Sequence, residues 1–325
     1  MTDLRMTDMG LGIACGLASA VCSAVSYLVS RQYRLVQGSL GRRGSALRLL
    51  AVSHVLMSAV CMPLTWAAWP ATSPSLRLFA LPLAASVGFY LLGQSSLFAA
   101  LKRVEASRMA PLLGLKIVML ACIVSFALGH VLDVRQWVAV ALSVAAAAIM
   151  QAGTGAVPAR AFGYVLSCCL CFAISDLWIV RLIEGLQSGG LASGASVGRL
   201  HAGFLALLIT YGLCGVVFAP LVLILRPYSR ADWAAAAQYA SAWLLSMVGL
   251  YCSFGLVGVV FGNILQSTRG IMSVALGAML AHLGWHELEQ RVDRAMLLRR
   301  FAAALLMTAA IAIYAIDLSQ ARPGM

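Results

Sequence analysis

Long uncharged stretches alternate with short charged segments along the whole chain. The stretches that exceed 20 residues without an Asp, Glu, Lys or Arg include 9–30, 49–76, 78–101, 136–159 and 200–225. About 20 consecutive apolar residues are enough for a helix to cross a bilayer. The backbone of such a segment has no water to bond to in the hydrocarbon, so a helix is the state expected for each. The pattern therefore predicts a chain that crosses a membrane many times.

The complete pattern predicts an all-α, polytopic membrane protein with ten transmembrane helices. Their expected positions are 10–30, 47–69, 77–101, 107–129, 134–152, 162–183, 199–225, 236–258, 263–284 and 298–317. The most difficult boundary lies between Asp232 and Glu287, where 54 residues carry a single charge, Arg269. That length requires two helices, and we expect the chain to turn in the glycine-rich stretch Gly255–Gly262.

The composition supports a membrane protein and excludes most soluble classes. The 325 residues are 62% hydrophobic and 10% charged, whereas a soluble domain is about 45–50% apolar and about 25% charged. The formal charge of +12 is spread over the ends of the apolar stretches. A nucleic-acid-binding protein would instead gather its basic residues in a stripe. All nine cysteines fall inside predicted helices, where cysteine behaves as a small apolar residue, so no disulfide framework is expected.

The basic residues are concentrated in alternate loops. Of the 23 Lys and Arg residues, 15 fall in the first, third, fifth, seventh and ninth predicted loops, and six fall in the even loops and the termini. Lys and Arg accumulate in the cytoplasmic loops of membrane proteins. We therefore expect a multi-pass protein of the cell (inner) membrane with its odd loops in the cytoplasm and both termini outside.

The two halves of the chain show a weak internal repeat. A shift of 161 positions aligns Tyr90 with Tyr251, and a shift of 151 positions aligns Tyr27 with Trp178. These matches predict a first five-helix repeat over 1–155 and a second over 156–325, with a chance match of apolar helices as the alternative. An odd number of helices inverts the second copy, and inverted repeats of this kind underlie many secondary transporters. The repeat therefore favours alternating access.

Four short motifs stand out along the chain: EASRMAPLLGLKI at 105–117, Leu128-Gly-His, Gln136-Trp, and QSTRGI at 266–271 in the second half. They resemble motifs of EamA-type carriers in the drug/metabolite transporter superfamily. The resemblance implies the ten-helix plan over about residues 10–318 and the transport of small metabolites, and its motifs say nothing of the substrate. The sequence departs from the family pattern at His130, where an acid often stands, and at Lys116, where that helix commonly carries Glu.

Among the ionisable residues inside the predicted helices, three stand out, because a charge at membrane depth costs about 2.5–3.5 kcal/mol on insertion scales. Asp176 is a candidate for binding a cation, carrying a proton or pairing with a base. Lys116 could bind an anionic group, pair with Asp176, or extend its stem to the membrane interface. Arg269 is a candidate substrate ligand or an interfacial anchor. Because such groups normally face the protein interior or water, all three are candidate site residues.

Polar and aromatic residues at repeat-related positions form a second candidate set. Tyr90 and Gln94 are four residues apart and share a helix face, and Tyr251 is the repeat equivalent of Tyr90. Tyr27 and Trp178 are equivalent in the same sense. Aromatic rings would bury the apolar part of a substrate while an amide or hydroxyl orients it. The alternative for each of these residues is interhelical packing.

The remaining polar residues inside the helices are expected to have structural roles. His54 and His282 can titrate near neutrality, yet a single membrane histidine more often packs between helices. Asn263 and Gln266 more often cap or bridge helices than bind a ligand.

Together these features favour a secondary active transporter of a small polar metabolite that works by alternating access. The expected partners are this substrate and the lipid bilayer, with protons as a candidate coupling ion. The sequence contains no Walker loop, and neither a cofactor, a metal site nor an enzymatic activity is expected. One alternative is a membrane-embedded enzyme acting on a lipid-linked substrate, with a metal held by His282, His286, Glu287 and Glu289. The other is an accessory subunit, which would be a solid bundle without a cavity.

Overall fold

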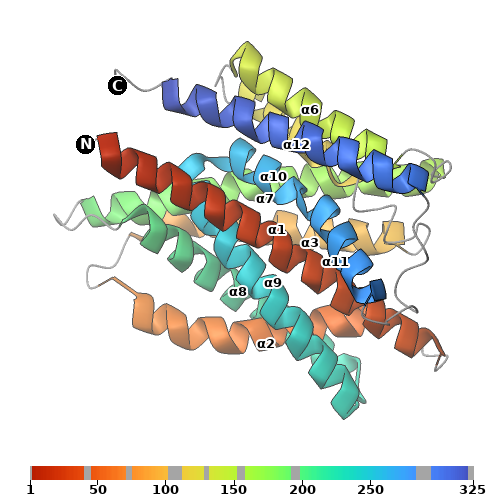
Figure 1. The fold of residues 1–325 in the computed structure, drawn as a ribbon. Coiled ribbons are helices and arrows are strands. Elements are labelled where there is room, and N and C mark those ends of the chain that lie inside the picture. Colours follow the sequence, from red (N-terminus) through yellow and green to blue (C-terminus); the bar gives the residue numbers. More distant parts are fainter. Residues whose placement is uncertain are drawn as a thin grey trace. The chain divides into compact units, whose positions relative to one another are not determined.

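The computed structural model describes residues 2–39, 45–70, 75–101, 112–127, 132–151, 158–191, 198–282 and 294–320, and helices make up nearly all of them (Figure 1). No strand occurs within these ranges, which confirms the all-α class. The helices are α1 (Thr2–Ser39), α2 (Ser45–Ala68), α3 (Leu76–Leu101), α5 (Leu115–Cys122), the π-helical turn η1 (Ile123–Ala127), α6 (Val134–Gln151), α7 (Ala159–Leu191), α8 (Arg199–Ile224), α9 (Arg230–Val257), α10 (Val259–Ser267), α11 (Arg269–His282) and α12 (Arg294–Gln320).

Several of these helices have the length and composition of membrane spans. Six described helices contain a stretch long and apolar enough to cross a bilayer: α1, α2, α3, α7, α8 and α9. Shorter apolar helical segments lie at Leu115–Phe126, Val134–Ile149 and Phe301–Ile313. The chain is therefore an integral membrane protein, and the count of ten spans stays a prediction.

Two helices extend well beyond the apolar stretches that predicted them. α1 covers Thr2–Ser39 rather than 10–30, and α7 covers Ala159–Leu191 rather than 162–183. Near the end of α7, Arg181 and Glu184 form an exposed ion pair of 3.1 Å along the helix. Charged residues can continue a helix once it has left the hydrocarbon, because backbone bonding does not depend on side-chain polarity. Hydropathy therefore located these membrane spans but underestimated the lengths of the helices.

The turn expected in the stretch Gly255–Gly262 is confirmed. It occurs at Gly258, between α9 and α10, and this residue has a φ of 83°. A residue without a Cβ adopts such a positive φ at no steric cost. The glycine therefore lets α9 end and α10 begin within a single residue.

The predicted helix 263–284 is interrupted at Thr268, between α10 and α11. The hydroxyl of Ser267 donates to the carbonyl of Ile264 at 2.6 Å, and that of Thr268 donates to the carbonyl of Leu265 at 2.7 Å. These side chains compensate carbonyls at the end of α10, as a helix break at membrane depth requires.

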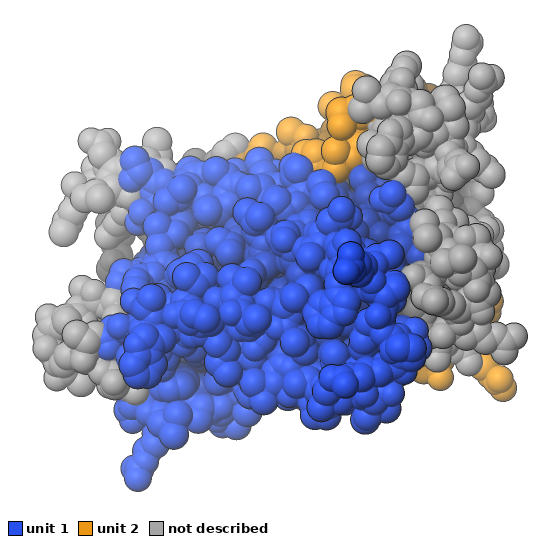
Figure 2. All heavy atoms as spheres, turned by 90° about the horizontal axis from the view of Figure 1, so that it is seen from below, with its two compact units in different colours: residues 1–88, 175–259 blue, residues 89–174, 260–325 orange. Residues whose placement is uncertain are grey.

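The described helices form two compact units, coloured in Figure 2. Unit 1 contains residues 1–88 and 175–259, and unit 2 contains residues 89–174 and 260–325. The chain passes from one unit to the other inside α3, inside α7 and at the start of α10. Each unit therefore combines segments that are distant in the sequence.

Unit 1 is built on close helix pairs, with α1 packed along α9 and α2 packed along α8. The hydroxyl of Ser246 lies 2.6 Å from that of Ser23 and donates to the carbonyl of Ser19 at 2.9 Å. A Cβ on Gly249 would lie 2.5 Å from the carbonyl oxygen of Cys15. Small and hydroxylated residues allow such approach where no hydrophobic effect drives the helices together.

In unit 2, α6 packs along α12, and the two helices lie side by side in Figure 1. Ala146 of α6 and Ala303 and Met307 of α12 form the buried centre of this contact. A second cluster joins the segments of α3 and α7 that belong to this unit and is centred on Ala100, Val165 and Cys168. Small side chains again lie where helices meet.

Candidate functional site

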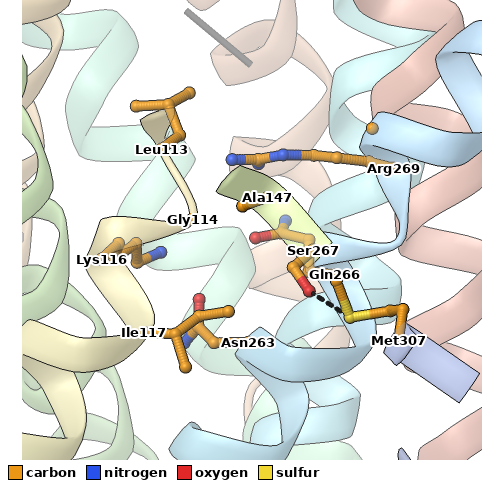
Figure 3. A pocket seen from close by; sticks show the side chains of 11 residues that line it. Leu113, Gly114, Lys116, Ile117, Ala147, Asn263, Gln266, Ser267, Arg269 and Met307 are labelled. Carbon is orange, nitrogen blue, oxygen red and sulfur yellow. Dashed lines mark hydrogen bonds between the residues drawn. The ribbon is translucent and has the colours of Figure 1, made fainter. Parts of the chain in front are cut away.

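A cavity opens inside unit 2 (Figure 3). Its empty volume is about 470 Å³, part of which is open to solvent. The segment 113–117 forms one wall, and α10 with the start of α11 forms another. Ala147 of α6 and Met307 of α12 complete the lining. The site is therefore assembled from four regions of the chain that the tertiary fold brings together.

Two cations from different helices line this cavity. Lys116 lies in α5 and is only 8% exposed, and Arg269 begins α11 and is half-buried. In Figure 3 the ammonium of Lys116 and the guanidinium of Arg269 both extend toward the space between the walls. The structure places both of these candidate site residues on the same hollow.

Two amide side chains stand beside the cations. Asn263 and Gln266 line the cavity from α10 and are each 4% exposed. Residues three apart on a helix share a face, so both amides point to the same side of α10. The sequence had suggested capping or bridging for these two residues. Their spacing, together with Gly270 one turn further on, is the signal that could have indicated a helix face that lines a cavity.

Phe172 of α7 connects Lys116 to another predicted site residue, Tyr90. The Lys116 ammonium nitrogen lies 5.9 Å from the centroid of the Phe172 ring, a distance at which a cation is attracted to the ring face. Tyr90 lies on the same ring, with centroids 6.1 Å apart and planes inclined by 34°. Gln94, one turn further along α3, is 3% exposed. Tyr90 therefore approaches Lys116 through a shared aromatic neighbour.

The two cations also share electrostatic neighbours in unit 2. Both Lys116 and Arg269 lie close enough to the thiols of Cys168 and Cys169 to interact with them electrostatically. None of the residues that line the cavity is acidic, within the described part of the chain. The described lining of the hollow therefore contains two basic residues and no acidic one.

Four predicted site residues lie in unit 1 instead. Asp176 is 5% exposed and Tyr251 is 2% exposed. The two side chains lie close enough to interact electrostatically. Tyr27 packs edge-on against Trp243, with centroids 6.3 Å apart. Trp178 is half-buried in α7. Asp176 and Lys116, which the sequence offered as a pair, belong to different units.

An aromatic cluster in unit 1 was not anticipated from the sequence. The indole N–H of Trp243 donates to the hydroxyl of Tyr211 at 2.9 Å. The His54 ring stacks on Tyr211 with centroids 6.2 Å apart, and it lies 4.6 Å from the centroid of Phe218. The packing role expected of His54 agrees with these contacts. Because each ring comes from a different turn or helix, no local spacing links them.

The metal cluster considered for an enzyme lies outside the described residues, except for the backbone of His282 at the end of α11. Within the ranges that the structure describes, no three His, Cys, Asp or Glu side chains gather as metal ligands. His130, where the sequence departs from the family pattern, also lies outside those ranges.

The helical fold, its apolar spans and a polar cavity in one unit together define a polytopic membrane protein. Residues 10–151 match the EamA-like transporter family. This match agrees with the resemblance in the sequence over the first half of the chain. The apolar spans make the lipid bilayer a partner of the chain.

The fold also resembles a solved structure. A crystal structure of another protein matches with a TM-score of 0.62 and 13% sequence identity, covering 94% of this chain and 99% of that chain. Identity at this level shows the fold alone. No curated protein matches the chain significantly.

Proposed function

We propose that the protein is a secondary active carrier that moves a small polar metabolite across the cell (inner) membrane by alternating access. The observation that carries this proposal is the cavity of unit 2, where two cations and two amides converge. Each ionisable group at membrane depth costs about 2.5–3.5 kcal/mol and is a functional candidate by default. Two of them on one hollow are more simply explained by a polar ligand than by packing.

The helix pairs support two inverted five-helix repeats over 1–155 and 156–325. Ser175 of α7 donates to the carbonyl of Ser86 of α3 at 2.8 Å, and Ser96 lies 3.1 Å from Ser167, so these helices run antiparallel. α1 and α9 also run antiparallel, from the Cys15–Gly249 contact to the bond between Tyr33 and Asp232. In the proposed repeats, α1 corresponds to α7 and α3 to α9. The α1–α9 pair is therefore the repeat equivalent of the α7–α3 pair.

Transport through the cavity is tested by filling it after folding. Ala147 lines the cavity, whereas its neighbour Ala148 is exposed. In a cysteine-free background reconstituted into liposomes, Ala147→Cys is treated with a bulky methanethiosulfonate reagent, and counterflow is measured with a panel of labelled metabolites. We expect labelling to abolish counterflow at Ala147→Cys and to leave it intact at Ala148→Cys.

The matched pair separates blockage from damage, because both proteins fold before the reagent is added. Counterflow that survives complete labelling of Ala147→Cys contradicts the cavity as the route. The same loss at Ala148→Cys contradicts it as well, since that side chain lies outside the lining.

We further propose Asp176 as the proton-coupling residue of this carrier, on the ground that it is a nearly buried acid in α7. Neutralising it in Asp176→Asn is expected to abolish accumulation driven by a pH gradient and to preserve substrate exchange, which needs no net proton movement. The control is Asp8→Asn, because Asp8 is exposed on α1. Unchanged gradient-driven accumulation in Asp176→Asn removes this role.

A further inference from the structure

We infer that the transported metabolite carries a carboxylate or phosphate group and that this anion binds between Lys116 and Arg269. The inference rests on the proposed function and names its substrate class. It is drawn from the composition of the cavity walls, the directions of the side chains in Figure 3, and the burial of the polar groups.

Charge is the first step of the argument. Lys116 and Arg269 supply two positive charges to a hollow whose described lining has no acidic residue. Low dielectric surroundings strengthen the interaction of such charges with a ligand anion. A cationic substrate would be repelled from the same place, and a neutral one would gain only the weaker attraction between a charge and a dipole.

Geometry is the second step. The guanidinium of Arg269 is a planar fork that can hold two oxygens of a carboxylate or phosphate, while the ammonium of Lys116 acts as a compact charge. In Figure 3 the two groups extend into the cavity from opposite walls. Phe172 lies 5.9 Å from the ammonium nitrogen and helps to fix the lysine on its side. An anion between the walls would meet both cations at once.

The remaining lining indicates a small ligand. Asn263 and Gln266 add two amide side chains to the lining, and both are 4% exposed. Ile117, Ala147 and Met307 form apolar walls around them. A short-chain metabolite with one or two anionic groups therefore fits the chemistry of the site better than a large or wholly apolar one.

The test compares probes that differ in charge, and the succinate series keeps the same four-carbon chain. Purified full-length protein in detergent is titrated with succinate, succinamide and 1,4-diaminobutane, and with glycerol 3-phosphate and glycerol, while its thermal unfolding is followed. Ligands that bind the folded state raise the unfolding temperature in a saturable way. We expect succinate or glycerol 3-phosphate to do so, and the neutral and cationic probes to have no effect.

Variants assign the effect to the cavity. Lys116→Gln and Arg269→Gln are each expected to weaken anion binding about tenfold or more, because a hydrogen bond to a charged group is worth that much. Lys116→Arg should retain most of the binding. The control is Arg160→Gln, since Arg160 is an exposed cation of unit 2. Equal binding of succinate and succinamide, or an equal loss in Arg160→Gln, overturns the inference.

A lipid headgroup carries the same chemistry and forms a separate arm. The protein is placed in nanodiscs of phosphatidylcholine alone or with phosphatidylglycerol. Stabilisation by phosphatidylglycerol that depends on Lys116 and Arg269, without any effect of the soluble anions, overturns the metabolite as the source of the anion. Soluble anions that stabilise the protein equally in both nanodiscs support it.

The outcomes distinguish this inference from the proposed function. If a neutral metabolite shows counterflow that Lys116→Gln and Arg269→Gln do not affect, the protein is a carrier but its substrate is not an anion bound by these residues. If anion binding depends on both residues but no counterflow is observed, the anion site stands and the carrier function is contradicted.

Discussion

At the scale of single residues, the start of α9 shows how one cap connects two helices. The Ser229 hydroxyl accepts from the backbone N–H of Asp232 at 3.2 Å, and the Asp232 carboxylate accepts from the backbone N–H of Ser229 at 2.8 Å. The other carboxylate oxygen accepts from the hydroxyl of Tyr33 on α1 at 2.7 Å. The reciprocal bonds form a capping box, and the third bond joins the cap to the neighbouring helix.

Removing the cap hydroxyl should destabilise the protein measurably. Ser229→Ala leaves the first N–H groups of α9 without their side-chain acceptor, and we expect a loss of about 0.5–2 kcal/mol in the free energy of unfolding. The measurement is thermal or denaturant unfolding in detergent. Ser229→Asn supplies another cap acceptor and should restore most of the stability. If both variants behave alike, the cap does not stabilise α9.

The residues of the cavity were only partly predictable at this scale. Lys116 and Arg269 were found from sequence because an ionisable group inside an apolar stretch is conspicuous. Asn263 and Gln266 were assigned structural roles, since an amide has no comparable energetic signature. Which face of α10 meets a hollow depends on helices that are distant in the sequence.

At the scale of helices, close approach of α1 and α9 depends on glycine at one position. In Gly249→Ala the new Cβ would lie 2.5 Å from the Cys15 carbonyl oxygen and 3.2 Å from Ser19. The backbone must shift to relieve this contact, and overpacking of this kind costs about 1–3 kcal/mol. We expect a corresponding loss of stability in unfolding measurements.

The matched control is Gly163→Ala in α7, where a Cβ would meet nothing within 4 Å. A helical Gly→Ala change without a clash is expected to be neutral or to stabilise by up to about 1 kcal/mol. Similar losses in the two variants would show that the close approach at Gly249 is not the cause.

Hydrogen bonds across the same helix pair should contribute less. Ser246→Ala removes the hydroxyl that contacts Ser19 and Ser23. Interhelical bonds in membranes contribute about 0.6 kcal/mol on average and about 1.7 at most, so a loss in this range is expected in unfolding experiments. Ser241→Ala serves as the control, because that exposed hydroxyl bonds only to Ala237 of its own helix. A loss of the same size at Ser241 would contradict the interhelical role.

At the scale of the whole molecule, the sequence predicts which loops face the cytoplasm, and a labelling experiment tests this orientation. The excess of Lys and Arg in the odd loops predicts that Arg226 is cytoplasmic and that Asp133, in the fourth loop, is outside. In whole cells expressing a cysteine-free background, an impermeant maleimide should label Asp133→Cys directly. It should label Arg226→Cys only after permeabilisation. The reverse pattern would invert the orientation.

The sequence by itself determined the all-α membrane class, the places of most spans, the turn near Gly258 and the resemblance to EamA-type carriers. It did so because transfer of apolar side chains and backbone into lipid is a local property, summed over about 20 residues. Even the candidacy of Lys116 and Arg269 follows from this local cost.

Only the tertiary structure decided which of these residues share a site. Lys116, Arg269, Asn263 and Gln266 come together because α5, α10 and α11 fold into the same unit, while Asp176 and Tyr251 fall in the other. Contacts between distant helices depend on the shape and small residues of both partners. That information is spread over pairs of segments, and no single stretch of sequence contains it.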